Sequence, residues 1–174
     1  MMKQLLFFIL IGTLFSCGGP KAFYDYDEQM NFEQCKSFSF YTDLNTGLNE
    51  LNEQRFVTSL SQALIAEGYQ QTEDSDFKIN FYAEFFEQRN NNTIGIGLGG
   101  GGGAVGGGVS GGIPIGGTQQ FISVTIEFAN TVNNELFWQA VVESKLDKQL
   151  TPIEREEAFL EIAKKALENF PPEK

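Results

Sequence analysis

Three stretches of the chain alternate hydrophobic and polar residues with the period of two that is typical of half-buried β-strands. They run from Phe77 to Glu87, from Phe121 to Phe128 and from Leu136 to Val142. A shorter run, Cys35 to Tyr41, sets phenylalanines between serines in the same way. The residues that this alternation directs toward a core are Phe38, Phe40, Phe77, Ile79, Phe81, Ala83, Phe85, Ile122, Val124, Ile126, Phe128, Leu136, Trp138, Ala140 and Val142.

Asn133-Asn134 stands between the last two of these runs. Asparagine tolerates left-handed dihedral angles, so this pair predicts a turn. The two flanking strands are therefore expected to form an antiparallel hairpin.

A helix is predicted over Leu51 to Glu67. Gly68 follows directly, at the position after a helix end where a left-handed residue is common. Hydrophobic residues recur within this segment at helical spacing, namely Phe56, Leu60, Ala63 and Leu64.

A second helix is predicted to begin within Thr151-Pro152-Ile153-Glu154. These residues place threonine at the N-cap, proline at the first helical position and glutamate at the third, which is the pattern of a capping box. Pro171-Pro172 ends the helix. Its hydrophobic stripe consists of Phe159, Ile162, Ala163, Ala166, Leu167 and Phe170.

The order of these elements is strand, helix, three strands, helix. Each predicted strand has one polar face, which is typical of an antiparallel sheet with one side open to solvent. We therefore expect an α+β fold, a two-layer sandwich in which about four antiparallel strands carry both helices on one face.

The first sixteen residues have the three parts of an export signal. Lys3 supplies a positive charge, and Leu5 to Phe15 is hydrophobic but shorter than the roughly 20 residues needed to span a bilayer. Leu14-Phe15-Ser16-Cys17 resembles a bacterial lipobox, which predicts cleavage after residue 16 and lipidation of Cys17. An ordinary secretory signal is the alternative. The expected mature chain has a lipidated tether over residues 17–22 and a single domain over residues 23–174.

Charge and residue content exclude several classes of function. Without Lys3 the chain has 11 Lys and Arg against 23 Asp and Glu, a net charge of −12, which disfavours binding to nucleic acid and to anionic lipid headgroups. The chain contains no histidine, so Ser-His-Asp and Cys-His catalytic units and histidine-ligated zinc sites are excluded. Once Cys17 is acylated, Cys35 is the only thiol, and we expect a small buried residue there; a reactive or intermolecular thiol is the alternative.

Residues 95–117 form a tract in which 14 of 23 residues are glycine. The tract has no Lys-Ser/Thr sequence and joins two strands, so a phosphate-binding loop and a dinucleotide fingerprint are both excluded. We expect a long hairpin loop, because glycine loses the most conformational entropy when it is ordered. The alternative is a surface for lipid or a partner, built from small residues between scattered Ile, Leu and Val.

Two groups of carboxylates invite a catalytic or calcium-binding role. Asp25 and Asp27 lie too close together in sequence to supply a calcium site alone. Glu154, Glu156 and Glu157 fall in the first turns of the second helix, where negative charge suits the helix dipole. We therefore predict no catalytic residues, no metal site and no cofactor. Most of the 17 phenylalanines occupy inward positions and are expected to pack in the core.

Several segments, taken in order, resemble the bacterial lipoprotein family catalogued as domain of unknown function 4136. The resemblance covers nearly all of the expected mature chain, and it implies an exported, lipid-anchored α+β domain without implying an activity. The segments that carry it are Phe23-Tyr24-Asp25-Tyr26-Asp27, Leu64-Ile65-Ala66-Glu67-Gly68-Tyr69, Asp76-Phe77-Lys78-Ile79, Leu136-Phe137-Trp138-Gln139 and Asn169-Phe170-Pro171.

The leading functional hypothesis is a non-enzymatic, lipid-tethered cell-envelope domain that binds another envelope component or has a structural role. Gly18 stands where an aspartate would indicate retention in the inner membrane, which favours the outer membrane facing the periplasm. A carrier or sensor that binds an apolar small molecule between sheet and helices is the second hypothesis. An enzyme with a lysine- or carboxylate-based mechanism is the third.

Overall fold

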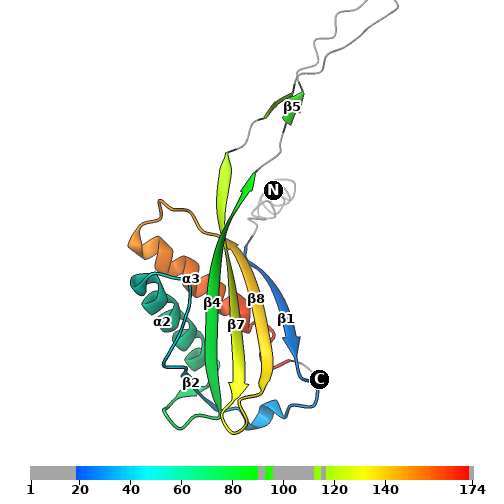
Figure 1. The fold of residues 1–174 in the computed structure, drawn as a ribbon, viewed down its shortest axis with the longest axis vertical. Coiled ribbons are helices and arrows are strands. Elements are labelled where there is room, and N and C mark those ends of the chain that lie inside the picture. Colours follow the sequence, from blue (N-terminus) through cyan, green and yellow to red (C-terminus); the bar gives the residue numbers. More distant parts are fainter. Residues whose placement is uncertain (1–18, 90–92, 96–111, 115–116, 173–174) are drawn as a thin grey trace, which may run out of the picture.

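The computed structural model describes residues 19–89, 93–95, 112–114 and 117–172. Their elements follow the order β-β-α-β-β-β-α, with short additional strands (Figure 1). The bounds are β1 Lys21–Tyr26, η1 Phe32–Gln34, β2 Ser37–Phe40, α2 Glu50–Ala66, β3 Gln70–Gln71, β4 Phe77–Arg89, β5 Thr93–Gly95, β6 Gly112–Pro114, β7 Thr118–Asn130, β8 Leu136–Lys145 and α3 Pro152–Leu167.

The main sheet has six strands in the order β1-β8-β7-β4-β2-β3. The α+β class is as expected, but the prediction of about four antiparallel strands is wrong. The pairs β1–β8, β8–β7 and β7–β4 are antiparallel, whereas β2 pairs in parallel with both β4 and β3. The helix α2 lies between β2 and β4 in the chain, and such a crossover returns the chain to the end of the sheet from which it left. The sheet is therefore mixed.

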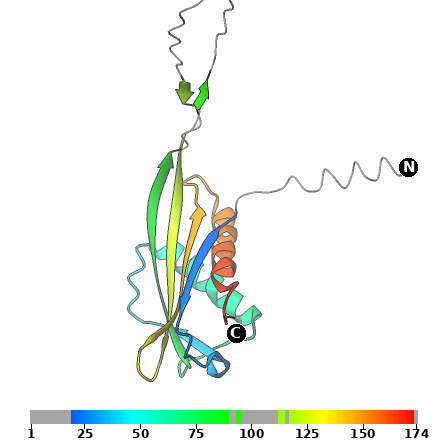
Figure 2. The ribbon, with the colours of Figure 1, turned by 90° about the vertical axis from the view of Figure 1, so that its right-hand side faces the viewer.

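Both helices pack on the same face of the sheet and against each other (Figures 1 and 2). The sequence correctly predicted two helix ends that carry a capping signal, the C-terminal end of α2 and the N-terminal end of α3. Gly68 follows α2 with a φ of 95°, in the left-handed region. At α3, the Thr151 hydroxyl accepts a hydrogen bond from the Glu154 amide while the Glu154 carboxylate accepts one from the Thr151 amide, which completes the capping box.

Aromatic side chains fill the space between the sheet and the helices. Phe56 of α2 lies 4.8 Å from Phe81 of β4 and 5.8 Å from Phe159 of α3, measured between ring centroids. Trp138 is 1% exposed and lies 4.5 Å from Phe128 and 5.1 Å from Phe170. The predicted packing of phenylalanines in the core is confirmed by these contacts.

A β-bulge changes the facing of β8. Ala129 pairs with Leu136 and Phe128 pairs with Trp138, so Phe137 is an extra residue in β8. Phe137 and Trp138 are both buried, whereas Leu136 is 51% exposed. The inward position predicted for Leu136 is therefore wrong. Phe85 is also 44% exposed, although its partner Ile122 is buried.

The two long strands β4 and β7 form an antiparallel hairpin whose connection carries the glycine tract. Gly95 ends β5 and Gly112 begins β6, and these two short strands pair with each other. Most of residues 95–117, together with the expected signal and Cys17, lie outside the described residues. Within the part of the chain that is described, no helix has the length and hydrophobicity needed to cross a membrane.

Candidate binding site on the open face of the sheet

Among the residues that the structure describes, no helix packs against one face of the main sheet, and we call it the open face (Figure 2). Strand pairing brings four polar residues into one row across this face. Asp25 of β1 lies opposite Gln139 of β8, Gln139 lies opposite Glu127 of β7, and Glu127 lies opposite Asn80 of β4. Their neighbours along the strands, such as Ile79 and Phe128, are buried on the other face.

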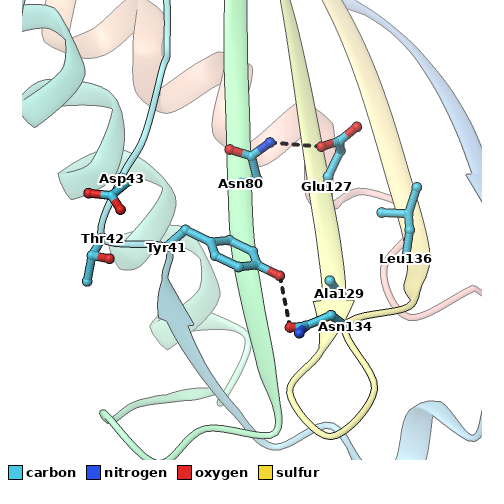
Figure 3. A pocket seen from close by; sticks show the side chains of 8 residues that line it. All are labelled: Tyr41, Thr42, Asp43, Asn80, Glu127, Ala129, Asn134 and Leu136. Carbon is cyan, nitrogen blue, oxygen red and sulfur yellow. Dashed lines mark hydrogen bonds between the residues drawn. The ribbon is translucent and has the colours of Figure 1, made fainter.

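Glu127 is the centre of this row. Its two carboxylate oxygens accept hydrogen bonds from different amide groups, one from Asn80 Nδ2 at 2.9 Å and one from Gln139 Nε2 at 3.1 Å. Figure 3 shows the Asn80 contact in the plane of the open face. This arrangement fixes the three half-buried side chains in position, and the charge of Glu127 strengthens both bonds. A carboxylate held in this way is better suited to orienting neighbours than to transferring protons.

A loop along the edge of β4 extends the row by an aromatic ring. The Tyr41 amide donates to the Ile79 carbonyl at 3.1 Å, which continues the pairing of β2 for one residue. The Tyr41 hydroxyl donates to Asn134 Oδ1 at 3.5 Å, and Lys78 Nζ lies 5.5 Å from the centre of the Tyr41 ring. Asn134 has a φ of 55°, which confirms the turn predicted at Asn133-Asn134.

Gly47 fixes the path of the same loop. The Ala83 amide donates to the Thr46 carbonyl at 2.8 Å, so the loop backbone lies directly against β4. Gly47 has a φ of 68°, and a Cβ at this position would lie 2.6 Å from the Ala83 carbonyl oxygen. Only glycine tolerates both the positive φ angle and this close approach. The loop that contains Gly47 carries Thr42 and Asp43 beside the open face.

These elements line a shallow, open pocket of about 490 Å³ on the open face (Figure 3). Its lining offers amide and hydroxyl groups, one aromatic ring and two carboxylates, with no cation among the lining residues that the structure describes. Such a lining offers hydrogen-bond acceptors to a ligand rich in donors, and the Lys78 ammonium lies beside it over the Tyr41 ring. The lining residues are Tyr41, Thr42, Asp43, Asn80, Glu127, Ala129, Asn134 and Leu136.

The carboxylates singled out in the sequence do not converge on a catalytic centre. Asp25 belongs to the polar row, and Asp27 accepts a hydrogen bond from the Gln29 amide at 2.8 Å in a local turn. Glu154 caps α3, and hydrogen bonds from the backbone and hydroxyl of Thr151 lower its pKa. Glu156 and Glu157 are exposed on α3. In the described ranges, no three carboxylate or thiol groups are arranged to hold a metal ion.

Cys35 is 3% exposed, as expected for a small buried residue. Burial raises the pKa of its thiol to about 11, and the charge of Asp76 adds to the effect. The thiolate is the reactive form of cysteine, so this thiol is inert at neutral pH. Cys17, the predicted lipidation site, lies outside the described residues.

The sequence contained part of the signal for this site, because Asn80 and Glu127 occupy outward positions of two predicted strands. It did not show which outward residues would be neighbours, since that depends on the register of β4, β7 and β8. It also gave no indication that Asp76 would connect the start of β4 to the start of β2. The Asp76 carboxylate accepts hydrogen bonds from the backbone amides of Lys36 and Ser37, each at 2.9 Å. Burial alone would raise the pKa of Asp76, but these bonds and one from the Ser37 hydroxyl lower it.

Comparison with solved structures shows the fold. A PDZ domain protein from Parabacteroides distasonis matches 99% of this chain with a TM-score of 0.56 and 12% sequence identity. The chain spans 41% of the length of that protein. Two structures of a PelC dodecamer from Paraburkholderia phytofirmans, one of them a point variant, match 89% of this chain and 99% of theirs. Their TM-scores are 0.47 and 0.44, each at 11% identity.

No curated protein sequence matches the chain. The profile of a domain of unknown function, DUF4136, matches residues 22–172. This range extends from the second residue of β1 to beyond the end of α3, and so includes both helices and the main sheet except Lys21. The chain therefore belongs to the DUF4136 family.

Proposed function

We propose that this protein is a lipid-anchored component of the cell envelope, attached through Cys17 to the outer membrane and facing the periplasm, whose DUF4136 domain acts by binding rather than by catalysis. The anchor is inferred from the signal-like residues 1–16 followed by a lipobox-like sequence. The binding role rests on one observation, the pocket of about 490 Å³ on the open face with its polar lining.

The position of the pocket is suited to an anchored protein. The chain enters the domain at Lys21, which pairs with Glu143, whereas the polar row contains Asp25, four residues further along β1. At about 3.3 Å per residue this separation is roughly 13 Å along the strand. A chain tethered through its N-terminal segment would therefore present the pocket away from the point of attachment.

The second hypothesis, a carrier of apolar small molecules, places the ligand in the core. Such a ligand would lie between sheet and helices, where Phe56 contacts both Phe81 and Phe159. A mass spectrum of the full chain purified in mild detergent tests this hypothesis. A retained apolar ligand in stoichiometric amount would favour the carrier over the envelope-binding domain.

The anchor is tested by metabolic labelling with a fatty-acid analogue. We expect label on the wild-type chain and on Cys35→Ala, and none on Cys17→Ala, which should also leave the membrane fraction. The Cys35→Ala variant controls for removal of a thiol in general, because Cys35 is buried. Label that persists on Cys17→Ala refutes lipidation at this residue.

The binding role is tested by site-specific photo-crosslinking in living cells. A crosslinking residue replaces Asp43 at the pocket or, as the control, Gln62 on an exposed position of α2. We expect a discrete adduct from position 43 that is absent from position 62. Adducts of equal yield from both positions, or from neither, would contradict a specific binding role for the open face.

A further inference from the structure

A second pocket lies at the other end of the domain, between the N-terminal ends of the two helices and the strands β4 and β7. Its volume is about 320 Å³. Lys21, where the chain enters β1, pairs with Glu143, and the amide of Leu146, just beyond β8, donates to the Gln120 carbonyl at 3.1 Å. Gln120 is one of the lining residues, so this pocket lies at the end of the sheet where the N-terminal segment attaches.

The lining of this pocket is cationic, although the chain has a net charge of −11. Arg55 of α2, Arg155 of α3 and Lys148 of the β8–α3 loop all contribute to it. Two of the three arginines of the chain are thus in one place. Among the lining residues that the structure describes, there is no carboxylate. This arrangement is the reverse of the pocket on the open face, which has two carboxylates and no cation in its described lining.

Hydrogen bonds orient the two guanidinium groups without neutralising them. Arg55 Nη1 donates to the side-chain oxygen of Asn52 at 3.0 Å. Arg155 Nη2 donates to the backbone carbonyls of Lys148 at 3.3 Å and Asp147 at 3.5 Å. Within the described part of the chain, neither guanidinium forms an ion pair with a carboxylate.

Lys148 is less firmly held than the arginines. Its Nζ lies 3.6 Å from a carboxylate oxygen of Glu87, and both side chains are largely exposed. An exposed pair of this kind contributes little energy, so Lys148 is available to a stronger anionic partner.

We infer that this pocket binds a phosphate group. A guanidinium presents planar pairs of donors that match phosphate oxygens, and an ammonium adds a point charge. A carboxylate ligand needs only one arginine, whereas two guanidiniums and an ammonium around one site match the higher charge and the additional oxygens of a phosphate. The positive ends of the dipoles of α2 and α3 lie at the same end of the sheet, where Glu50, Glu53 and Glu154 in the first turns offset part of their potential. The half-exposed Phe85 ring supplies an apolar wall for whatever carries the phosphate.

The test uses the full chain, labelled with ¹⁵N and purified in nonionic detergent, at constant ionic strength. Inorganic phosphate is titrated in one arm, and phosphatidylglycerol is added to the micelles in the other, with phosphatidylcholine as the neutral comparison. The Nε–Hε resonances of Arg55 and Arg155 are followed by NMR, together with the backbone amide of Gln120, which also reports on binding in the variants that lack the arginines. We expect both arginine resonances to shift in a saturable way with at least one of the two phosphate sources.

Variants separate a pocket from a general charge effect. Arg55→Gln with Arg155→Gln should weaken the apparent Kd by about tenfold or more, because two charge-assisted contacts are lost. Lys36→Gln with Lys164→Gln removes the same charge from exposed sites outside this lining and should leave the Kd within about twofold. Lys148→Gln, which removes no hydrogen bond to the backbone, should weaken the Kd by about threefold and serves if the double arginine variant does not fold.

The outcomes are distinct. Saturation by inorganic phosphate shows that the phosphate group is sufficient, and saturation only by phosphatidylglycerol identifies a lipid headgroup as its source; either supports the inference. The inference is overturned if neither source produces a saturable shift. It is also overturned if the Lys36/Lys164 variant loses as much affinity as the pocket variants. The outcome does not depend on the open-face pocket or on acylation of Cys17.

Discussion

Replacement of Gly47 by alanine should destabilise the domain more than the same change at Gly68. Both glycines have positive φ angles, 68° and 95°. They differ in their surroundings: a Cβ on Gly47 would lie 2.6 Å from the Ala83 carbonyl oxygen, whereas a Cβ on Gly68 has nothing within 4 Å. Gly68→Ala is therefore a matched control for the conformational penalty alone.

The magnitudes follow from these two geometries. An alanine held in the left-handed region costs about 1–2 kcal/mol, which applies at both positions. At Gly47 the backbone must also move away from β4, and this movement breaks the hydrogen bond from the Ala83 amide to the Thr46 carbonyl. Loss of that bond adds about 0.5–1.5 kcal/mol, so we expect a total of roughly 1.5–3.5 kcal/mol.

Urea unfolding followed by far-ultraviolet circular dichroism measures both changes in the free energy of unfolding. The m-value should stay constant, since the surface exposed on unfolding is the same. A crosslinking residue at Asp43 in the Gly47→Ala background should also give less adduct, because the loop carries one side of the open-face pocket. Equal destabilisation by the two variants would refute the close approach of the loop to β4 as the reason for glycine at position 47.

Three further predictions follow from the core, from the β2–β4 connection and from the hairpin. Trp138→Ala should cost roughly 3–5 kcal/mol in urea unfolding, the range for buried aromatic truncations, and Val132→Ala at a 92% exposed position is the control; a loss below about 1 kcal/mol would contradict burial of the tryptophan. Asp76→Asn should cost about 1 kcal/mol at pH 7 because its bonds are solvent-exposed. Since the folded-state pKa of Asp76 is lowered, this difference should be present above the unfolded pKa of about 3.9 and fade as the pH falls below it; a difference independent of pH from 7 to 2 would refute the assignment. Replacing residues 95–117 by an Asn-Gly turn should leave the free energy of unfolding unchanged or raise it by about 0.6 kcal/mol per halving of loop length, which thermal unfolding measures, and collapse of the fold would show that the tract is part of the domain.

The sequence by itself determined the elements whose signals are local. The capping box at Thr151 and Glu154 and the glycine after α2 specify helix ends through contacts within a few residues. The alternation over β4 and β7 specifies two long strands with one buried face, because successive side chains of a strand point to opposite sides. These signals were sufficient for the α+β class and for most of the core.

Only the tertiary structure decided how these elements pair. The strand β1 was not predicted, and β2 was placed in an antiparallel sheet, whereas it lies parallel to both β4 and β3. A polar face on a strand indicates that one side of the sheet is open, but it does not indicate the direction of the neighbouring strand. The bulge that turns Phe137 inward and Leu136 outward likewise depends on the register with β7.

Both candidate sites, the pocket on the open face and the cationic pocket, were also decided by the tertiary structure. Glu127 meets Asn80 and Gln139 because three strands pair in one register, over sequence separations of 47 and 12 residues. Arg55 and Arg155 are 100 residues apart in sequence and meet because α2 and α3 begin at the same end of the sheet. Local sequence fixes the conformation of a segment, whereas a site that is assembled from several segments exists only once the chain has chosen its long-range contacts.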